Sequence, residues 1–187
     1  MRFSGGSLKG RRLPGAVTRG VRPTPARVRE AMFDILGQDL SGWTVLDATG
    51  GSGILAIEAA GRGADLVVIL DRSPRAVRAI EKAVLALSLA GRVQVRRADA
   101  LRDPLPDRCF DLVVADPPYG SPLEPWLDRL RPLARAWFVL EHAARQAAPG
   151  QADSGVRTRR YGDTALTFYP GTPSASSRIR TGGGGAG

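Results

Sequence analysis

Several residue types are scarce or absent in this chain, and each scarcity excludes a class of protein. Cys109 is the only cysteine among 187 residues, so an intrachain disulfide is impossible. His142 is the only histidine, so the chain has no cluster of His and Cys that could hold a metal, and we expect none to be bound. Asparagine is missing altogether, which excludes any motif that depends on its side chain.

Long apolar runs are also missing. None approaches the roughly 20 residues of a membrane-spanning helix, and residues 1–6 lack the apolar stretch of a secretory signal. A cytoplasmic location is therefore the default expectation. The hydrophobic content of 43% is typical of globular proteins, and 187 residues are enough for one α/β domain with a sizeable core.

Acidic residues are nearly absent from the first 30 residues. This segment has eight basic residues and one acidic residue, and so carries +7 of the net charge of +9. Arginine outnumbers lysine 25 to 2, as a GC-rich genome would produce, but that bias does not explain the missing acids. We interpret residues 1–23 as an irregular basic arm, with room for a short hairpin, that binds nucleic acid. The candidate contact residues are Lys9, Arg11, Arg12, Arg22, Arg27 and Arg29.

Apolar runs predict four strands in the first two thirds of the chain, and a glycine or an acid follows each of them. The strands are expected at 43–47, 66–70, 93–97 and 110–115. Predicted helices alternate with the first three strands. This alternation predicts an α/β fold with a mostly parallel, doubly wound sheet, which binds its ligands at the carboxyl ends of the strands.

Capping residues and apolar spacing predict the helices. Thr24 is the expected N-cap of a helix that ends at Gly37, and Ser73 is the expected N-cap of a helix that ends at Gly91. Another helix is expected at 54–60. In the helix that follows Thr24, the residues expected to face the core are Val28, Met32, Ile35 and Leu36. In the helix that follows Ser73, they are Val77, Ile80, Val84, Leu85 and Leu87.

The last third of the chain predicts a helix, a fifth strand, a polar loop and a β-hairpin. These elements are expected at 122–133, 136–140, 145–155, and 156–161 with 165–169. The hairpin should add antiparallel strands to the parallel sheet. Residues 171–187 are rich in Gly and Ser and are expected to be a disordered tail, so the globular domain should span 24–170.

A glycine-rich turn, Ala48-Thr49-Gly50-Gly51-Ser52-Gly53, joins the first strand to its helix. Glycines permit positive φ and close approach of a ligand, and the helix start offers N–H groups. Asp71 follows about 20 residues later, the spacing of an acid that binds ribose hydroxyls. Because Gly51-x-Gly53-x-x-Ala56 also fits a dinucleotide fingerprint, a nicotinamide dehydrogenase is an alternative. Such an enzyme normally has a separate substrate domain, and only about 70 residues follow Asp116.

The segment Asp116-Pro117-Pro118-Tyr119 directly follows the predicted buried strand 110–115. Asp116 can accept a hydrogen bond, and the two prolines should form a stiff turn whose carbonyls stay free. Tyr119 offers a flat face on which a nucleobase can stack. Together these four residues could hold an exocyclic amino group and present its nitrogen to an electrophile.

A methyltransferase that uses S-adenosylmethionine (SAM) accounts for all four strand ends. The glycine turn would hold the methionine part, Asp71 the ribose and Asp99 the adenine amino group, while Asp116 to Tyr119 would hold the acceptor amine. The candidate cofactor-binding residues are Asp47, Thr49, Gly50, Gly51, Gly53, Asp71, Arg72, Asp99 and Ala100, and the candidate catalytic residues are Asp116, Pro117, Pro118 and Tyr119.

From about Met1 to Tyr169 the chain resembles the bacterial 16S rRNA guanine-N2 methyltransferases. The resemblance rests on these segments: 8–13, 22–24, 27–33, the glycine turn, Asp116 to Tyr119, Glu141-His142 and Tyr161-Gly162-Asp163-Thr164. It implies a Rossmann-like SAM-dependent methyltransferase fold, SAM as the cofactor, and methylation of one guanine in the small-subunit head (position 966 in the usual rRNA numbering). The implied partner is 16S rRNA or the assembled small subunit, with no membrane, no metal and a monomeric enzyme.

The chain departs from that family at two places: the family commonly has Phe-Ala-Gly-Ser-Gly in the turn, and Glu at the position of Asp71. Two alternatives remain open, a DNA adenine-N6 methyltransferase and a non-catalytic rRNA-binding assembly factor. A protein glutamine methyltransferase would require Asn-Pro-Pro-Tyr, and the chain has no asparagine. For Glu141 and His142, a role at the acceptor site and a role in packing at a strand end are both open.

Overall fold

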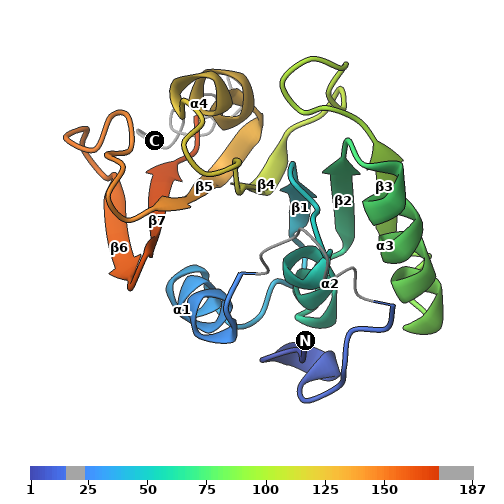
Figure 1. The fold of residues 1–187 in the computed structure, drawn as a ribbon. Coiled ribbons are helices and arrows are strands. Elements are labelled where there is room, and N and C mark those ends of the chain that lie inside the picture. The colour runs from blue at the N-terminus through green and yellow to red at the C-terminus, as the bar shows by residue number, and fades with distance from the viewer. Residues whose placement is uncertain (16–23, 173–187) are drawn as a thin grey trace, which may run out of the picture.

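Seven strands form a single sheet in the order β3-β2-β1-β4-β5-β7-β6 (Figure 1). The computed structural model describes residues 1–15 and 24–172. Strands β1 to β5 are parallel to one another, and β7 is antiparallel to both of its neighbours. The strands are β1 (Thr44–Asp47), β2 (Leu66–Asp71), β3 (Val93–Arg97), β4 (Phe110–Ala115), β5 (Ala134–Ala143), β6 (Arg157–Tyr161) and β7 (Thr164–Pro170).

The predicted α/β fold and the terminal hairpin are confirmed, but the hairpin is arranged differently from the expectation. Its second strand, β7, lies inside the sheet between β5 and β6. Because the chain reverses direction twice, β6 runs parallel to β5, and only β7 is antiparallel. The hairpin turns at Gly162 and Asp163, since Tyr161 pairs with Thr164.

Helices cover both faces of the sheet, so the fold is doubly wound. They are α1 (Ala26–Leu36), α2 (Ile54–Gly61), α3 (Pro74–Ala86) and α4 (Glu124–Leu130), with short 3-10 helices η1 (Gly6–Leu8) and η2 (Arg131–Leu133). Neighbouring strand residues point to opposite faces. Val45 packs with α1, α2 and α3 in one core cluster, whereas Leu46 packs with α4 in a second cluster on the other face (Figure 1).

Helix α1 differs from its predicted start and face. Pro25 occupies the N-cap position, and Thr24, the expected cap, turns its side chain toward β5. Ile35 is 39% exposed, whereas Phe33 and Arg29 are buried. The buried face includes Arg29 and Phe33 as well as Met32 and Leu36. It is therefore turned around the helix axis relative to the predicted face, and Ile35 lies at its edge.

Helix α3 begins as predicted and ends early. Ser73 Oγ accepts a hydrogen bond from Ala76 N–H, so the predicted cap is confirmed. The helix ends at Ala86 and not at Gly91, and Ser88, just beyond the end, has the left-handed φ of 58°. Leu85 is 68% exposed because it lies on the side of the helix opposite the buried residue Ile80.

The first 15 residues fold onto the domain instead of forming an irregular arm. An antiparallel bridge joins Arg2 to Arg12, so the short hairpin is confirmed. Three apolar side chains of this hairpin, Phe3, Leu8 and Leu13, are buried in the core cluster that contains α2. At the hairpin turn, Ser7 Oγ donates to the carbonyl of Gly61 at 3.0 Å. Residues 16–23 and most of the predicted tail, 173–187, lie outside the described residues.

Candidate active site

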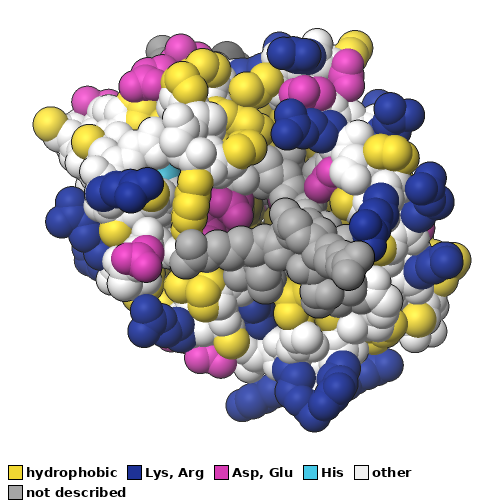
Figure 2. All heavy atoms as spheres, viewed as in Figure 1, with side chains coloured by type: hydrophobic (Ala, Val, Ile, Leu, Met, Phe, Trp, Pro, Cys, Tyr) yellow, Lys and Arg dark blue, Asp and Glu magenta, His cyan; other side chains and the backbone are white. Residues whose placement is uncertain are grey.

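A cavity of about 570 Å³ opens at the carboxyl ends of the parallel strands. This volume lies in the usual range for small-molecule sites. Figure 2 shows Lys and Arg side chains around much of the edge of this view, with acidic and hydrophobic side chains both among them and nearer the middle. The lining includes most of the predicted residues, namely Thr49, Gly51, Asp71, Arg72, Asp99, Ala100, Asp116, Pro117, Pro118 and Tyr119.

A smaller cavity of about 50 Å³ lies beside the first and shares part of its lining. Asp47 and Gly50 line this small cavity, together with Ser52 and Ile54 at the start of α2. Gly53 lines neither cavity within the described residues. It has φ of 75° at the N-cap of α2, and a Cβ there would lie 3.0 Å from Ile80 Cγ1, so its role is to let the turn enter the helix against α3.

The glycine turn packs tightly on β2. Gly50 N–H donates to the carbonyl of Leu70 at 2.7 Å, and a Cβ at Gly50 would lie 2.6 Å from Ile69 Cγ2. No side chain fits at this point, which explains glycine there. Gly51 N–H donates to Asp71 Oδ2 at 2.8 Å, and Ser73 N–H donates to Asp71 Oδ1 at 2.7 Å. The carboxylate of Asp71 therefore joins the turn to the end of β2.

Asp47 is buried at the end of β1, where its Oδ1 accepts a hydrogen bond from Thr49 N–H at 3.1 Å. Burial raises the pKa of Asp47 to about 7 even though this hydrogen bond acts in the opposite direction. The negative charges of Asp71 and Glu141 raise this pKa further. Like charges that oppose ionisation in this way make the site favourable for a cationic group.

The Asp116 to Tyr119 segment is bonded directly to the glycine turn. Asp116 N–H donates to Thr49 Oγ1 at 2.7 Å, which joins the end of β4 to the loop after β1. The carbonyl of Pro118, expected to be free, accepts from Ser121 Oγ at 2.6 Å because the chain turns back after Tyr119. Tyr119 is 43% exposed, and its hydroxyl lies 3.3 Å from Thr164 Oγ1 at the start of β7.

Glu141 lines both cavities, and sequence reasoning left its role open. Ala115 and Leu140 are register partners, so Asp116 and Glu141, the next residues, lie side by side at the ends of β4 and β5. Glu141 is 4% exposed, and its Oε2 accepts a hydrogen bond from Thr24 Oγ1 at 2.9 Å. Glu141-His142 is one of the segments on which the family resemblance rests. That observation could have indicated that Glu141 belongs to the site.

His142 faces away from the cavities, because adjacent strand residues point to opposite faces. Its Nε2 lies 2.9 Å from Thr167 Oγ1, which in turn lies 2.9 Å from Thr158 Oγ1. The side chain is buried, and burial lowers the pKa of His142. Of the two roles left open for this histidine, the geometry supports packing between β5, β6 and β7.

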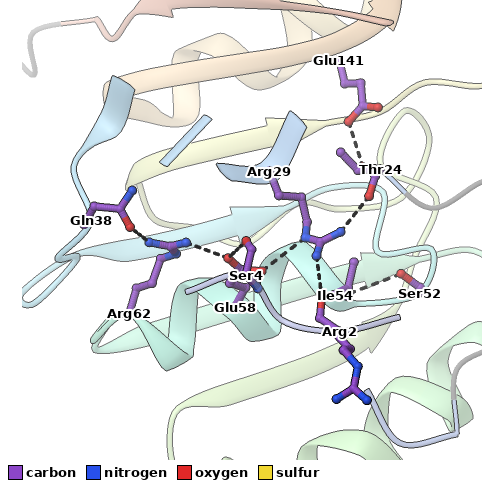
Figure 3. A network of polar contacts seen from close by, with 10 residues as sticks. All are labelled: Arg2, Ser4, Thr24, Arg29, Gln38, Ser52, Ile54, Glu58, Arg62 and Glu141. Atoms are coloured by element: carbon purple, nitrogen blue, oxygen red, sulfur yellow. Dashed lines mark hydrogen bonds and ion pairs between the residues drawn. The ribbon is translucent and has the colours of Figure 1, made fainter. Parts of the chain in front are cut away.

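Arg29 does not belong to a nucleic-acid surface, which corrects the sequence prediction. It is buried, and its Nε donates to Glu58 Oε2 at 3.2 Å, while its other nitrogens donate to the carbonyls of Thr24 and Arg2 (Figure 3). A buried guanidinium needs such partners, and the carboxylate of α2 supplies the charge. The side chain therefore joins α1 and α2 to the N-terminal hairpin.

Glu58 is the centre of this buried network. Arg62 Nη2 donates to Glu58 Oε1 at 2.7 Å, Ser4 Oγ donates to the same oxygen at 2.5 Å, and Gln38 contacts Arg62 (Figure 3). Burial acts to raise the pKa of Glu58, but hydrogen bonds from Ser4 and Arg62 and the charge of Arg29 outweigh it and hold the pKa below its usual value. The carboxylate is therefore ionised and fully paired.

The other candidate nucleic-acid residues are exposed or undescribed. Lys9, Arg11 and Arg12 are exposed on the hairpin, whose turn packs against the last residues of α2, the end remote from the glycine turn. Arg27 is exposed near the β6–β7 turn, since a Cβ at Gly162 would lie 2.9 Å from its Nη2. Arg22 lies outside the described residues.

Among residues 1–15 and 24–172, no group of three or more His, Cys, Asp or Glu side chains could hold a metal ion. Within the same residues, no helix is long and apolar enough to cross a membrane.

A family model described as conserved hypothetical protein 95 matches residues 1–170. The chain belongs to this family. A relative from Bacillus subtilis, named as a candidate rRNA methyltransferase (YlbH), is 32% identical over 180 residues, which are 90% of this chain and 98% of the relative. The ribosomal RNA small subunit methyltransferase D of Buchnera aphidicola is 29% identical over 120 residues, which are 63% of this chain and 62% of that enzyme.

Solved structures agree with the family assignment. The structure of an Escherichia coli protein described as a candidate methyltransferase (yhhF) superposes with a TM-score of 0.78 and 27% identity. The match covers 92% of this chain and 98% of that one. The predicted fold, that of Rossmann-like methyltransferases, is therefore confirmed for this member of the family.

Proposed function

We propose that this protein is a SAM-dependent methyltransferase that modifies the exocyclic N2 of one guanine in 16S rRNA, the guanine at position 966. The observation that carries the proposal is the junction of the two motifs in one cavity. The bond from Asp116 N–H to Thr49 Oγ1 holds the Asp-Pro-Pro-Tyr turn against the glycine turn. An acceptor amine held by one motif is thus close to a ligand held by the other. Relatives named as rRNA methyltransferases support the choice of substrate.

The cavity suits SAM in size and in charge. SAM supplies a methyl group on a sulfonium centre, and its methionine part carries an ammonium group. The carboxylate of Asp47 favours such a cation, and the N–H groups at the start of α2 favour its carboxylate. Asp71, Arg72, Asp99 and Ala100 line the larger cavity, where they would hold the ribose and the adenine.

The acceptor side of the cavity would orient a poor nucleophile. The lone pair of the guanine amine is delocalised into the ring, so the amine must be turned before it can attack. Asp116 Oδ and the carbonyl of Pro117 would accept its two hydrogens, and Tyr119 would stack on the base. Fixing nitrogen and methyl carbon in line at near-attack distance would supply much of the rate. The N–C bond would form as the bond between the methyl carbon and the sulfonium sulfur breaks, so that S-adenosylhomocysteine would leave and Asp116 Oδ would take the proton released by the amine. The base must leave its stack to enter, which is easiest in a loop.

Transfer of tritiated methyl groups from SAM tests this proposal. The acceptors are small ribosomal subunits that lack the modification, free 16S rRNA, and DNA as the third arm. Label that maps to a single guanine N2 is the expected result, and the better of the two RNA acceptors identifies the natural substrate. Label on adenine in DNA would indicate the DNA methyltransferase instead. RNA binding without label on any acceptor would indicate a non-catalytic assembly factor.

A further inference from the structure

We propose that Glu141 is a specificity-determining residue that accepts a hydrogen bond from N1–H of the target guanine, beside Asp116 at N2. This inference rests on the proposed function and adds the means by which guanine is selected. It begins from register: Asp116 and Glu141 follow the paired residues Ala115 and Leu140 on adjacent parallel strands. Neighbouring parallel strands are about 4.8 Å apart, so two such carboxylates can contact adjacent atoms of one base.

The orientation of Glu141 is fixed by the buried network. Thr24 Oγ1 donates to Glu141 Oε2 at 2.9 Å, and Arg29 Nη1 donates to the backbone carbonyl of Thr24 at 2.8 Å. Arg29 is itself bound to Glu58 on α2 (Figure 3). A carboxylate has about four acceptor positions, so a group that Thr24 orients can accept more than one hydrogen bond. Arg29 and Thr24 are thus positioning residues for Glu141.

Guanine and adenine differ at the atom that Glu141 would contact. The pairing edge of guanine has two adjacent donors, N1–H and the N2 amine, which two neighbouring carboxylates can accept. In adenine, N1 is an acceptor with no hydrogen, and a carboxylate facing it is repelled. A pair of acidic side chains therefore favours guanine and also rejects adenine, since an unpaired or repelled polar group in a closed site is costly.

The test compares guanine with 2-aminopurine, which keeps the N2 amine but has an acceptor at N1. Small subunits are reconstituted with 16S rRNA that carries either base at the target position, and kcat/KM is measured for wild type and Glu141→Gln. We expect wild type to prefer guanine by roughly 100-fold. The glutamine amide can donate to an acceptor N1, so the preference should fall at least about tenfold in the variant.

The dissociation constant of SAM separates this role from a role in cofactor binding. It should stay within about twofold of wild type in Glu141→Gln if the residue contacts the base. An unchanged preference for guanine overturns the inference, whether or not SAM binding weakens. Because 2-aminopurine also lacks O6, the preference of one protein alone does not isolate the contact at N1. The informative quantity is the change in preference between wild type and Glu141→Gln. Wild type that leaves guanine unmethylated in every acceptor would instead refute the proposed function.

A second variant keeps the inference testable if Glu141→Gln does not fold. Thr24→Val removes the hydroxyl that orients Glu141 while nearly keeping the shape of the side chain. It should lower the preference for guanine in the same direction, by a smaller factor. The contrary result is that Thr24→Val keeps the full preference for guanine and that Thr24→Ser behaves in the same way. It would show that the orientation of Glu141 is not used to select guanine.

Discussion

Two groups of buried charge in this protein shift the pKa of a carboxyl group in opposite directions. Around Glu58, two guanidinium groups and a serine surround one carboxylate, and the pKa of Glu58 lies below its usual value. Around the small cavity, the carboxylates of Asp47, Asp116 and Glu141 lie together, and burial and neighbouring negative charge raise the pKa of Asp47 to about 7. The first group joins elements of the fold. The second indicates a candidate ligand site, because strongly perturbed pKa values cluster at functional sites.

Removing a carboxylate from the cavity should affect activity far more than stability. Asp116→Ala removes the acceptor for the guanine amine, so methyl transfer should fall by about 1000-fold or more, with SAM binding nearly unchanged. Tritium transfer and calorimetric binding of SAM measure the two effects. The matched control is Asp107→Ala, on an exposed loop, which should keep full activity. Near-normal turnover of Asp116→Ala would refute the role of this residue.

Removing the carboxylate of Glu58 should affect stability far more than activity. Glu58→Ala leaves two buried guanidinium groups without their counter-charge, and the free energy of unfolding should fall by about 3–5 kcal/mol. Urea unfolding measures this loss. Glu30→Ala, at an exposed position of α1, serves as the control and should change stability by less than about 0.5 kcal/mol. Equal effects in the two variants would mean that the buried network contributes no net stability.

The pH dependence of stability should report the raised pKa of Asp47. The pKa of Asp47 is about 7 in the folded protein and near 3.8 when unfolded, so the folded state holds the proton more tightly. The stability contributed by protonated Asp47 is complete below about pH 4 and is lost as pH rises through 7. Asp47→Asn should abolish this loss, and without SAM the variant should be more stable than wild type at pH 8 by a few kcal/mol at most.

Urea unfolding of ligand-free wild type and Asp47→Asn at pH 5 and pH 8 makes the comparison. The advantage of the variant should grow with pH, while its affinity for SAM should be weaker at both values. An advantage that is the same at both pH values would mean that Asp47 does not titrate in this range.

The smallest effect is expected at an exposed cation. Arg27→Ala should leave stability within about 0.5 kcal/mol and lower the salt dependence of RNA binding by about one phosphate contact. Filter binding at several salt concentrations measures the slope, and Arg78→Ala, exposed on α3, is the control. An unchanged slope would mean that Arg27 does not contact RNA. The basic residues of the N-terminal hairpin would then have to account for the salt dependence of binding.

Local patterns in the sequence predicted much of the site. The β4 strand was predicted with its observed limits, 110–115, and the Asp-Pro-Pro-Tyr turn and most predicted cofactor residues line one cavity. These features are contiguous motifs at strand ends, and the parallel sheet brings such ends together. Sequence motifs could predict only where these residues lie in the fold. The roles of the residues stay predictions.

Contacts between distant segments could not be predicted. Arg29 looked like any other arginine of a basic segment, because its partner Glu58 is 29 residues away on another helix. Thr24 has the pattern of a helix cap, yet its hydroxyl is bound to Glu141, which is 117 residues away. Pairing of this kind depends on how helices are placed on the sheet, and neither periodicity nor capping preference contains that information.

The order of the sheet has a consequence for synthesis of the chain. Of the seven described strands, the ribosome makes β7 last, yet β7 lies between β5 and β6 and pairs with both. Until Pro170 has emerged, β5 has no neighbour on that side, and Tyr119 lacks its contact with Thr164. A chain interrupted before β7 therefore leaves the strand that carries Glu141 at an open edge. The surroundings of Tyr119 and Glu141 are thereby complete only after β7 has been made.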